Sequence, residues 1–204
     1  GQVGKAFRNE ITPGNFIFRL IEFEQMEIEY FISPEDWESI FDFWQKEMWS
    51  WCVDILGLSE NKLRIYEHPQ EKLSHYSKRT IDIEFEYPFG FKELYGLAYR
   101  TDFDLKAHQE ASGKSLEYFD QNANKKFIPH VIEPTFGLDR SALALLLNHY
   151  HEEEVPSASG TMETRTVLKF PSHLAPVQIA LLPLSKKPEL TGETKKIFDI
   201  LRKK

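Results

Sequence analysis

The chain has 204 residues, of which 41% are hydrophobic and 14% aromatic, so it can bury the core of one large domain or of one and a half domains. Its net charge of −7 excludes a surface that is basic throughout, as in many nucleic-acid-binding proteins, but leaves room for a local basic patch. The single cysteine, Cys52, excludes an internal disulfide bond and a cysteine-rich zinc site, and its apolar helical surroundings predict a buried, inert thiol. No apolar run has the length of a transmembrane helix and no signal peptide opens the chain, which favours the reducing cytoplasm.

The first predicted elements are two strands and a long helix. Residues 2–10 and 16–31 flank a Pro-Gly-Asn turn signal and read as an antiparallel hairpin. Ser33 and Pro34 then give a helix start, and apolar residues recur at three- and four-residue spacing as far as Gly57. We expect the tryptophans in this helix to belong to the core.

The middle of the chain predicts further hairpins. Residues 63–67 form a short predicted strand and residues 69–76 a helical turn, and strands over 80–87 and 91–100 flank a Pro-Phe-Gly turn. A short helix closed by Gly113 follows, then a hairpin of residues 116–120 and 126–133, and then a helix over 139–151. Because hairpins dominate, the prediction is an α+β fold whose mainly antiparallel sheet carries helices on one face.

The last part of the chain changes character. Residues 152–165 are first acidic and then rich in Pro, Ser and Gly, which predicts a linker or a mobile loop. Residues 177–182 predict a buried strand that opens a second unit, and a basic helix ends the chain. A start without Met inside a strand pattern, and an end shortly after this strand, predict a fragment of a longer protein.

Charged side chains gather on the first predicted hairpin. Arg8 and Glu10 are two residues apart, so on a strand they point to the same face, as Arg19 and Glu27 do on the returning strand. A solvated sheet face with weak cross-strand ion pairs is one interpretation. The phenylalanines interspersed among these charges favour a ligand cleft instead.

A second group of polar residues follows more than a hundred residues later. Glu133 and Thr135 lie at the end of a predicted strand, and Gly137 permits close approach of the backbone. Arg140 occupies the first turn of the next helix, where a cation opposes the helix dipole. Either an anionic ligand or a partner carboxylate, such as Asp139 or a neighbouring glutamate, accounts for Arg140.

These two regions resemble a known family. The segment FRNE followed by FEQMEIEYF resembles motif 2 of class II aminoacyl-tRNA synthetases, and EPTFGLDR before an apolar helix resembles motif 3. Together with the segment YRTDFDL that lies between them, these segments are similar in sequence to the homodimeric type of glycyl-tRNA synthetase. The resemblance implies a class II catalytic core over residues 1–155, a linker over 156–165, and over 166–204 the beginning of an α/β anticodon-binding domain.

The family resemblance implies a ligase that uses ATP and Mg²⁺. Such an enzyme activates glycine to glycyl-adenylate and transfers it to tRNA(Gly), as a cytoplasmic homodimer. Motif 1, which builds the dimer interface in the family, is absent from this chain. We therefore expect weak or no aminoacylation by the chain in isolation.

The resemblance also implies roles for individual residues. Arg8 and Arg140 are the catalytic residues: Arg8 holds the α-phosphate and the amino-acid carboxylate, where a planar guanidinium fits best, and Arg140 reaches the γ-phosphate. Glu10 meets the adenine amino group and Phe23 stacks on the base, while Glu93 is the candidate ligand of Mg²⁺. The full ATP set is Arg8, Asn9, Glu10, Phe18, Arg19, Leu20, Ile21, Glu22, Phe23, Glu93, Leu94, Gly137, Leu138, Asp139 and Arg140. The glycine set is Phe23, Glu24, Gln25, Met26, Glu27, Arg100, Glu133, Pro134, Thr135, Phe136 and Gly137.

Some residues depart from the family pattern. Gly14 and Ile21 stand where many relatives have arginine, which predicts weaker contacts with ATP or with the acceptor end of the tRNA, and Thr135 replaces a serine but keeps its hydroxyl. A non-catalytic binding or accessory protein on the same fold, with a nucleic-acid or protein partner, is the alternative function, and a ligase for another acceptor is a third. Retention of the charged residues, including Arg8, Glu133 and Arg140, favours the ligase.

Overall fold

The structure is a computed structural model that describes residues 1–157 and 159–203. Ala158, in the predicted linker, and Lys204, at the end of the predicted second domain, lie outside the described residues. Two compact units make up the chain, Gly1–Lys169 and Phe170–Lys204.

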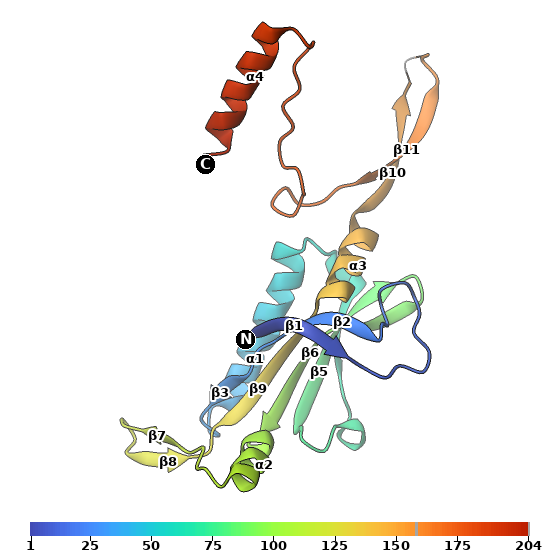
Figure 1. The fold of residues 1–204 in the computed structure, drawn as a ribbon. Coiled ribbons are helices and arrows are strands. Elements are labelled where there is room, and N and C mark those ends of the chain that lie inside the picture. The colour runs from blue at the N-terminus through green and yellow to red at the C-terminus, as the bar shows by residue number, and fades with distance from the viewer. Residues whose placement is uncertain (158, 204) are drawn as a thin grey trace. The chain divides into compact units, whose positions relative to one another are not determined.

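The first unit is built on a seven-stranded antiparallel sheet (Figure 1). Every ladder in it is antiparallel, which confirms the α+β prediction. In spatial order the strands are β1 (Gln2–Phe7), β2 (Glu22–Glu27), β9 (His130–Gly137), β6 (Gly90–Thr101), β5 (Arg79–Tyr87) and β4 (Leu63–Glu67), and β3 (Tyr30–Ile32) also pairs with β9.

The two faces of this sheet differ in polarity because successive side chains on a strand point to opposite faces. On β5, Ile81, Ile83 and Phe85 are buried, and Asp82 and Glu84 alternate with them on the other face. The neighbouring strands β6 and β9 show the same alternation. One face therefore carries the apolar core, and we call the opposite face the polar face.

Helices cover the apolar face. Helix α1 (Trp37–Ser50) continues into a π-helical turn, η1 (Trp51–Ile55), and Trp37 stacks on Tyr99 of β6 with ring centroids 4.5 Å apart. From α3 (Leu138–His149), Ser141 shares a 2.7 Å hydrogen bond with the Tyr95 hydroxyl of β6. Cys52 is fully buried, as predicted.

Smaller elements complete the first unit. Two short 3-10 helices, η2 (Glu60–Lys62) and η3 (Gln70–Lys72), flank β4. Helix α2 (Phe103–Ser112) follows β6 and ends at Gly113, whose φ of 66° is the left-handed conformation that glycine adopts readily. Strands β7 (Tyr118–Asp120) and β8 (Lys125–Phe127) form a separate hairpin.

The first predicted hairpin is interrupted by a long loop. Strand β1 ends at Phe7 and β2 begins at Glu22, so residues 8–21 form a loop pinned by a bridge between Gly14 and Arg19. Pro13 cannot donate to a ladder, and Asn15 and Phe16 have φ values of 56° and 55°, which no strand tolerates. The prediction of strands over 8–10 and 16–21 is therefore wrong, and Arg8 and Glu10 extend from the loop.

Beyond this loop the predicted strand is real but locally broken. Both β2 and β3 pair with β9 in the same register, with Glu27 opposite Thr135 and Tyr30 opposite Ile132. The interruption thus covers only residues 28 and 29. This register places Glu29 across from Glu133.

The predicted linker contains a regular hairpin. Strands β10 (Tyr150–Pro156) and β11 (Met162–Leu168) pair antiparallel, so an irregular loop over 152–165 is wrong, and α3 ends at His149 rather than 151. The sequence prediction missed both strands, because the run of glutamates and the Pro, Ser and Gly residues that follow it are typical of exposed loops. Whether this hairpin connects two domains stays a prediction.

The second unit contains α4 (Pro188–Leu201), whose first position is a proline as the helix rules favour. The strand predicted over 177–182 is wrong, since these residues adopt no regular structure and Val177, Ile179 and Leu182 are exposed. A strand needs a neighbour for its backbone hydrogen bonds, and the described residues of this unit supply none. The anticodon-binding character of residues 166–204 stays a prediction.

Candidate functional site

A hollow in the first unit lies where the loop over residues 8–21 meets the polar face of the sheet and the start of α3. Its empty space, with the open mouth included, is about 570 Å³. Arg8 and Arg140, from opposite ends of the unit's sequence, both line it. The lining residues are Arg8, Glu10, Ile17, Phe18, Arg19, Leu20, Phe23, Glu24, Gln25, Glu93, Leu94, Thr135, Gly137, Asp139 and Arg140.

The guanidinium of Arg140 is held on three sides. Its Nε donates to the carbonyl of Phe18 at 3.2 Å, and its Nη1 donates to the carbonyl of Glu93 at 2.9 Å and to the Glu93 carboxylate at 3.0 Å. The guanidinium carbon also lies 4.3 Å from the centroid of the Phe18 ring. A neighbouring glutamate thus partners Arg140, which was one of the two alternatives for this residue.

Phe18 in turn is fixed by an aromatic cluster from the β5–β6 turn. Its ring packs edge-on against Tyr87 and Phe89, with centroids 5.0 and 5.1 Å away, and those two rings stack on each other. Phe18 is buried although it belongs to a loop. This cluster therefore sets the orientation of Arg140 through Phe18.

Arg8 differs from Arg140 in its surroundings. Its guanidinium carbon lies 5.4 Å from the centroid of the Phe23 ring, and within residues 1–157 and 159–203 no carboxylate forms an ion pair with it. Nearby, Arg19 pairs with Glu10 at 3.1 Å. Arg8 is therefore the cation of this hollow whose charge is available to an anion.

The first turn of α3 also carries Asp139. Its Oδ2 accepts a 2.8 Å hydrogen bond from the backbone N–H of Glu24, which ties the start of α3 to β2. A carboxylate in the first helical turn also suits the helix dipole. Asp139 is therefore a structural anchor in this structure, and it does not partner Arg140.

Two carboxyl groups face one another above Gly96. A Cβ atom added at Gly96 would lie 3.6 Å from Glu93 Oε1 and 3.9 Å from Asp82 Oδ1. Burial and the charge of Glu93 raise the pKa of Asp82 to about 6, against the opposing effect of His68, whose Nε2 lies 2.8 Å from Asp82 Oδ2. Sequence reasoning missed Asp82, although the alternation of β5 placed it on the face opposite the core.

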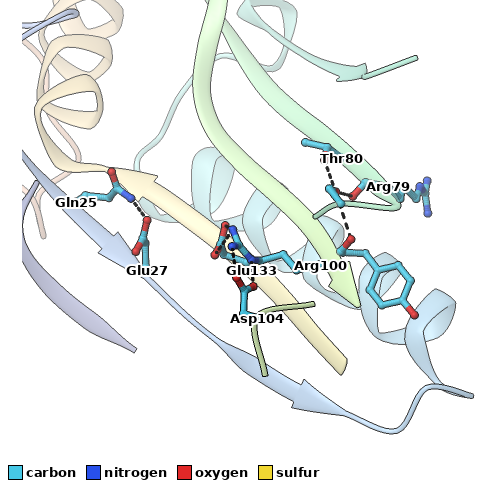
Figure 2. A network of polar contacts seen from close by, with 9 residues as sticks. Gln25, Glu27, Arg79, Thr80, Arg100, Asp104 and Glu133 are labelled. Carbon is cyan, nitrogen blue, oxygen red and sulfur yellow. Dashed lines mark hydrogen bonds and ion pairs between the residues drawn. The ribbon is translucent and has the colours of Figure 1, made fainter. Parts of the chain in front are cut away.

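Another charged network lies further along β9 on the polar face (Figure 2). Arg100 grips Asp104 with two hydrogen bonds, Nε to Oδ2 at 2.7 Å and Nη2 to Oδ1 at 3.0 Å, and reaches Glu133 with Nη1 at 3.0 Å. The ring of Tyr76 covers the guanidinium at 4.1 Å. Arg100 and Glu133 both belong to the predicted glycine set, whereas Asp104 and Tyr76 do not.

Glu133 is the perturbed acid of this network. Burial, followed by a hydrogen bond with the Glu29 side chain, raises the pKa of Glu133 to about 7, in spite of the Arg100 charge. The hydrogen bonds from Arg100 lower the pKa of Asp104. Sequence reasoning missed Glu29, because its position opposite Glu133 depends on strand register.

The predicted site residues divide between these two regions and the rest of the sheet. Glu27 accepts a hydrogen bond from Gln25 beside the network (Figure 2) and, like Arg100 and Glu133, does not line the hollow. Met26, Pro134 and Phe136 alternate with the polar residues and point to the apolar face, so their side chains are misassigned to a glycine site. Four residues of the predicted ATP set do not line the hollow: Asn9, Ile21, Glu22 and Leu138. The side chain of Glu22 forms an ion pair with Lys5 instead.

Known proteins resemble this chain in sequence. No family model matches it. It is 53% identical over 203 residues to "Glycine--tRNA ligase" of Corynebacterium efficiens and 52% identical over 204 residues to that of Streptomyces coelicolor, covering 98% of this chain and 44% of each relative. By sequence the chain is similar to glycine–tRNA ligases over nearly its whole length. It spans less than half of the length of these relatives, and the enzyme of Thermobifida fusca, 51% identical over 206 residues, gives the same coverage of 44%.

A solved structure shows the same fold. A prolyl-tRNA synthetase from Cryptosporidium parvum, crystallised with L-proline and AMP, superposes with a TM-score of 0.67 over 99% of this chain and 40% of that one. At 18% identity this likeness concerns the fold alone, and it confirms the class II catalytic core. None of the helices in the described residues is both long and apolar enough to cross a bilayer.

Proposed function

We propose that the chain is the part of a glycine–tRNA ligase that binds ATP and glycine, activates glycine as glycyl-adenylate and presents it to tRNA(Gly). The observation that carries this proposal is the common hollow of Arg8 and Arg140, which lie 132 residues apart in the sequence, in a chain that is similar in sequence to glycine–tRNA ligases. Two arginines on one hollow suit a polyphosphate, because guanidinium groups match phosphate geometry.

In the first half-reaction a carboxylate oxygen of glycine attacks the α-phosphorus of ATP, and the bond to the bridging oxygen breaks, releasing pyrophosphate. Arg8 is suited to hold the α-phosphate and the glycine carboxylate because no carboxylate of the described residues neutralises it. Arg140 is oriented before the substrate arrives, so it meets the γ-phosphate without reorganisation. Glu10 and Phe23, which line the same hollow, are the candidates for the adenine.

The ammonium group of glycine is assigned to the acidic network beside this hollow. Thr135 lines the hollow, and Glu133 lies two residues before it on the same face of β9. Gln25 and Glu27 of the predicted glycine set lie on this face as well, because they pair with β9 at Gly137 and Thr135. Ammonium recognition therefore takes place along β9, next to the phosphate site.

Mg²⁺ between phosphates needs only one or two protein carboxylates. Among the described residues no cluster of three metal-ligating side chains occurs, but Glu93 and Asp82 lie together above Gly96, and Glu93 lines the hollow. These residues fit a cation that takes its other ligands from ATP and water. When bound, Mg²⁺ would neutralise charge on the phosphates.

The wider assignments belong to the whole protein. We infer a homodimer that works in the cytoplasm, with tRNA(Gly) as the acceptor: its terminal ribose hydroxyl attacks the carbonyl carbon of glycyl-adenylate, and AMP leaves. Because motif 1 is missing from the 204 residues, we expect this chain by itself to be weakly active or inactive.

ATP–pyrophosphate exchange with glycine, alanine or serine tests the proposal, on this chain and, where the chain is part of a longer protein, on that protein. Exchange that requires glycine, and that Arg8→Ala reduces at least a hundredfold, is the expected result, since a lost transition-state contact of this kind costs about 3–4 kcal/mol. Arg165→Ala is the matched control, because Arg165 pairs with Glu153 on the β10–β11 hairpin. Exchange with alanine or serine but not glycine contradicts the substrate, and ATP binding without any exchange favours a non-catalytic protein.

A further inference from the structure

Two glutamates face each other on the polar face, Glu133 from β9 and Glu29 from the break between β2 and β3. Strands β2 and β3 keep one register on β9, so that Glu29 falls opposite Glu133, between the pairs Glu27–Thr135 and Tyr30–Ile132. Directly opposed side chains on one face have Cβ atoms about 5 Å apart, and like charges in this arrangement repel. In accordance with this placement, the Glu29 side chain is, after burial, one of the causes that raise the pKa of Glu133.

The arginine of the network is already committed. Arg100 donates two hydrogen bonds to Asp104, and its Nη1 forms an ion pair with Glu133, whose side chain is 14% exposed. One positive charge therefore faces three carboxyl groups, Asp104, Glu29 and Glu133. With all three ionised the network carries two uncompensated negative charges in a half-buried place.

The further cations on the elements around Glu133 lie on α2: Lys106, which pairs with Asp102, and His108, whose charge acts on Asp104. On β6 the residue opposite Glu133 is Ala98, and the charged group beyond it is Arg100. Asp104 comes from α2, and on the β2 side Glu27 accepts from Gln25. The titratable hydroxyl of Tyr76 belongs to the ring that covers Arg100.

We propose that Glu133, opposed by Glu29, holds a proton at neutral pH in the free protein and that the ammonium group of the bound amino acid displaces this proton. The inference deepens the proposed function and rests on it for the identity of the ligand. An ammonium supplies the positive charge that the network lacks and also three hydrogen-bond donors. Glu29 is thereby a specificity-determining residue: a substrate without a free cationic amine cannot drive the proton out.

Proton displacement makes glycine binding depend on pH in a definite direction. Burial raises the pKa of Glu133 to about 7, so below pH 7 the ammonium must replace a bound proton, whereas above it the carboxylates are already free. We expect KM for glycine in ATP–pyrophosphate exchange to fall about tenfold from pH 6 to pH 8. Binding measured by calorimetry in buffers of different ionisation enthalpy should release about 0.9 proton per glycine at pH 6 and about 0.1 at pH 8.

Glu29→Gln tests the pair. The amide can still donate a hydrogen bond to Glu133 but carries no charge, so the ratio of KM at pH 6 and pH 8 should shrink to about twofold or less. Glu29→Asp keeps a titratable carboxyl and should keep part of the pH dependence. Glu38→Gln, at an exposed position in the first turn of α1, is the matched control and should retain the tenfold ratio.

The outcomes separate this inference from the proposed function. Glycine-dependent exchange in which Glu29→Gln retains the wild-type pH ratio overturns the role of Glu29 and leaves the ligase standing. Absence of glycine-dependent exchange in a longer protein that contains this chain overturns the ligase, whereas its absence in the 204 residues alone is expected. In that case urea unfolding of the chain without ligand still tests the proton on Glu133: the wild-type free energy of unfolding must fall from pH 5 to pH 8, and an equal fall in Glu29→Gln overturns the role of Glu29.

Discussion

Replacing Glu133 by Gln should stabilise the protein above pH 7, although it removes an ion pair. The folded state raises the pKa of Glu133 from 4.5 to about 7, so the folded protein holds a proton that the unfolded chain has released over this interval. The bound proton stabilises the folded protein fully below pH 4.5, and this stabilisation is lost as the pH rises through 7. Each unit of pKa shift corresponds to about 1.4 kcal/mol. The shift of Glu133 therefore lowers the free energy of unfolding by about 3 kcal/mol between pH 4.5 and pH 8.

This figure is meaningful because the Glu133 side chain is 14% exposed, so water screens it little. A domain is stable by about 5–15 kcal/mol in total, so the change is well within the reach of a urea titration. The Gln variant cannot ionise. Its free energy of unfolding should match the wild type near pH 4.5 and exceed it increasingly up to pH 8, by at most about 3 kcal/mol.

Tryptophan fluorescence is the suitable signal, since Trp37, Trp44, Trp49 and Trp51 all belong to the first unit. Asp104→Asn is a control whose effect on stability has the opposite pH dependence. Hydrogen bonds from Arg100 lower the pKa of Asp104, so the ionised Asp104 stabilises the folded protein above the ordinary pKa of aspartate, and this stabilisation is lost as the pH falls. This variant should therefore be less stable than the wild type at pH 8. Parallel pH profiles of wild type and Glu133→Gln between pH 5 and 8 would refute the reasoning.

Three other predictions concern the hollow and the core. Arg140→Lys loses the fork that joins the Phe18 carbonyl to Glu93, so we expect KM for ATP to rise about tenfold, the loss of about 1.4 kcal/mol, while glycine KM stays the same. Phe89→Ala removes one of the rings that hold Phe18, and should raise KM for ATP while Phe89→Leu recovers part of it; an unchanged KM in both variants contradicts the positioning role. Burial raises the pKa of Cys52 to about 12, so a thiol reagent at pH 8 should modify it only in urea, and rapid modification of the folded protein would contradict its burial.

The sequence was sufficient where a local period repeats. Ile81, Ile83 and Phe85 alternate with Asp82 and Glu84, and the strand predicted over 80–87 is observed as β5, Arg79–Tyr87. The helix predicted over 139–151 is observed as α3, Leu138–His149. In both cases the spacing of apolar residues within the segment predicts which side chains are buried, so the element can be predicted without knowledge of distant contacts.

The sequence was insufficient where distant residues decide the geometry. Arg8 and Glu10 have the spacing of a strand, yet they extend from a loop whose path depends on Pro13 and on the positive φ of Asn15. The position of Glu29 opposite Glu133 follows from strand register, which local spacing does not encode. For the same reason the misassignment of Met26, Pro134 and Phe136 arose from treating whole motifs as site residues, whereas alternate side chains enter the core.

The polar and apolar faces of β9 together explain why the charges stay where they are. A shift of one residue in register would turn Ile132, Pro134 and Phe136 out of the core, so the apolar side chains fix the positions of Glu133 and Thr135. At about 3.4 Å per residue, Glu133 and Gly137 are roughly 14 Å apart along the strand. The proposed ammonium site and the proposed phosphate site at the two ends of this stretch would therefore be held at a constant separation by core packing. Opposed carboxylates cost stability in the free protein, and such a cost persists where the surrounding packing enforces it and a ligand cation relieves it.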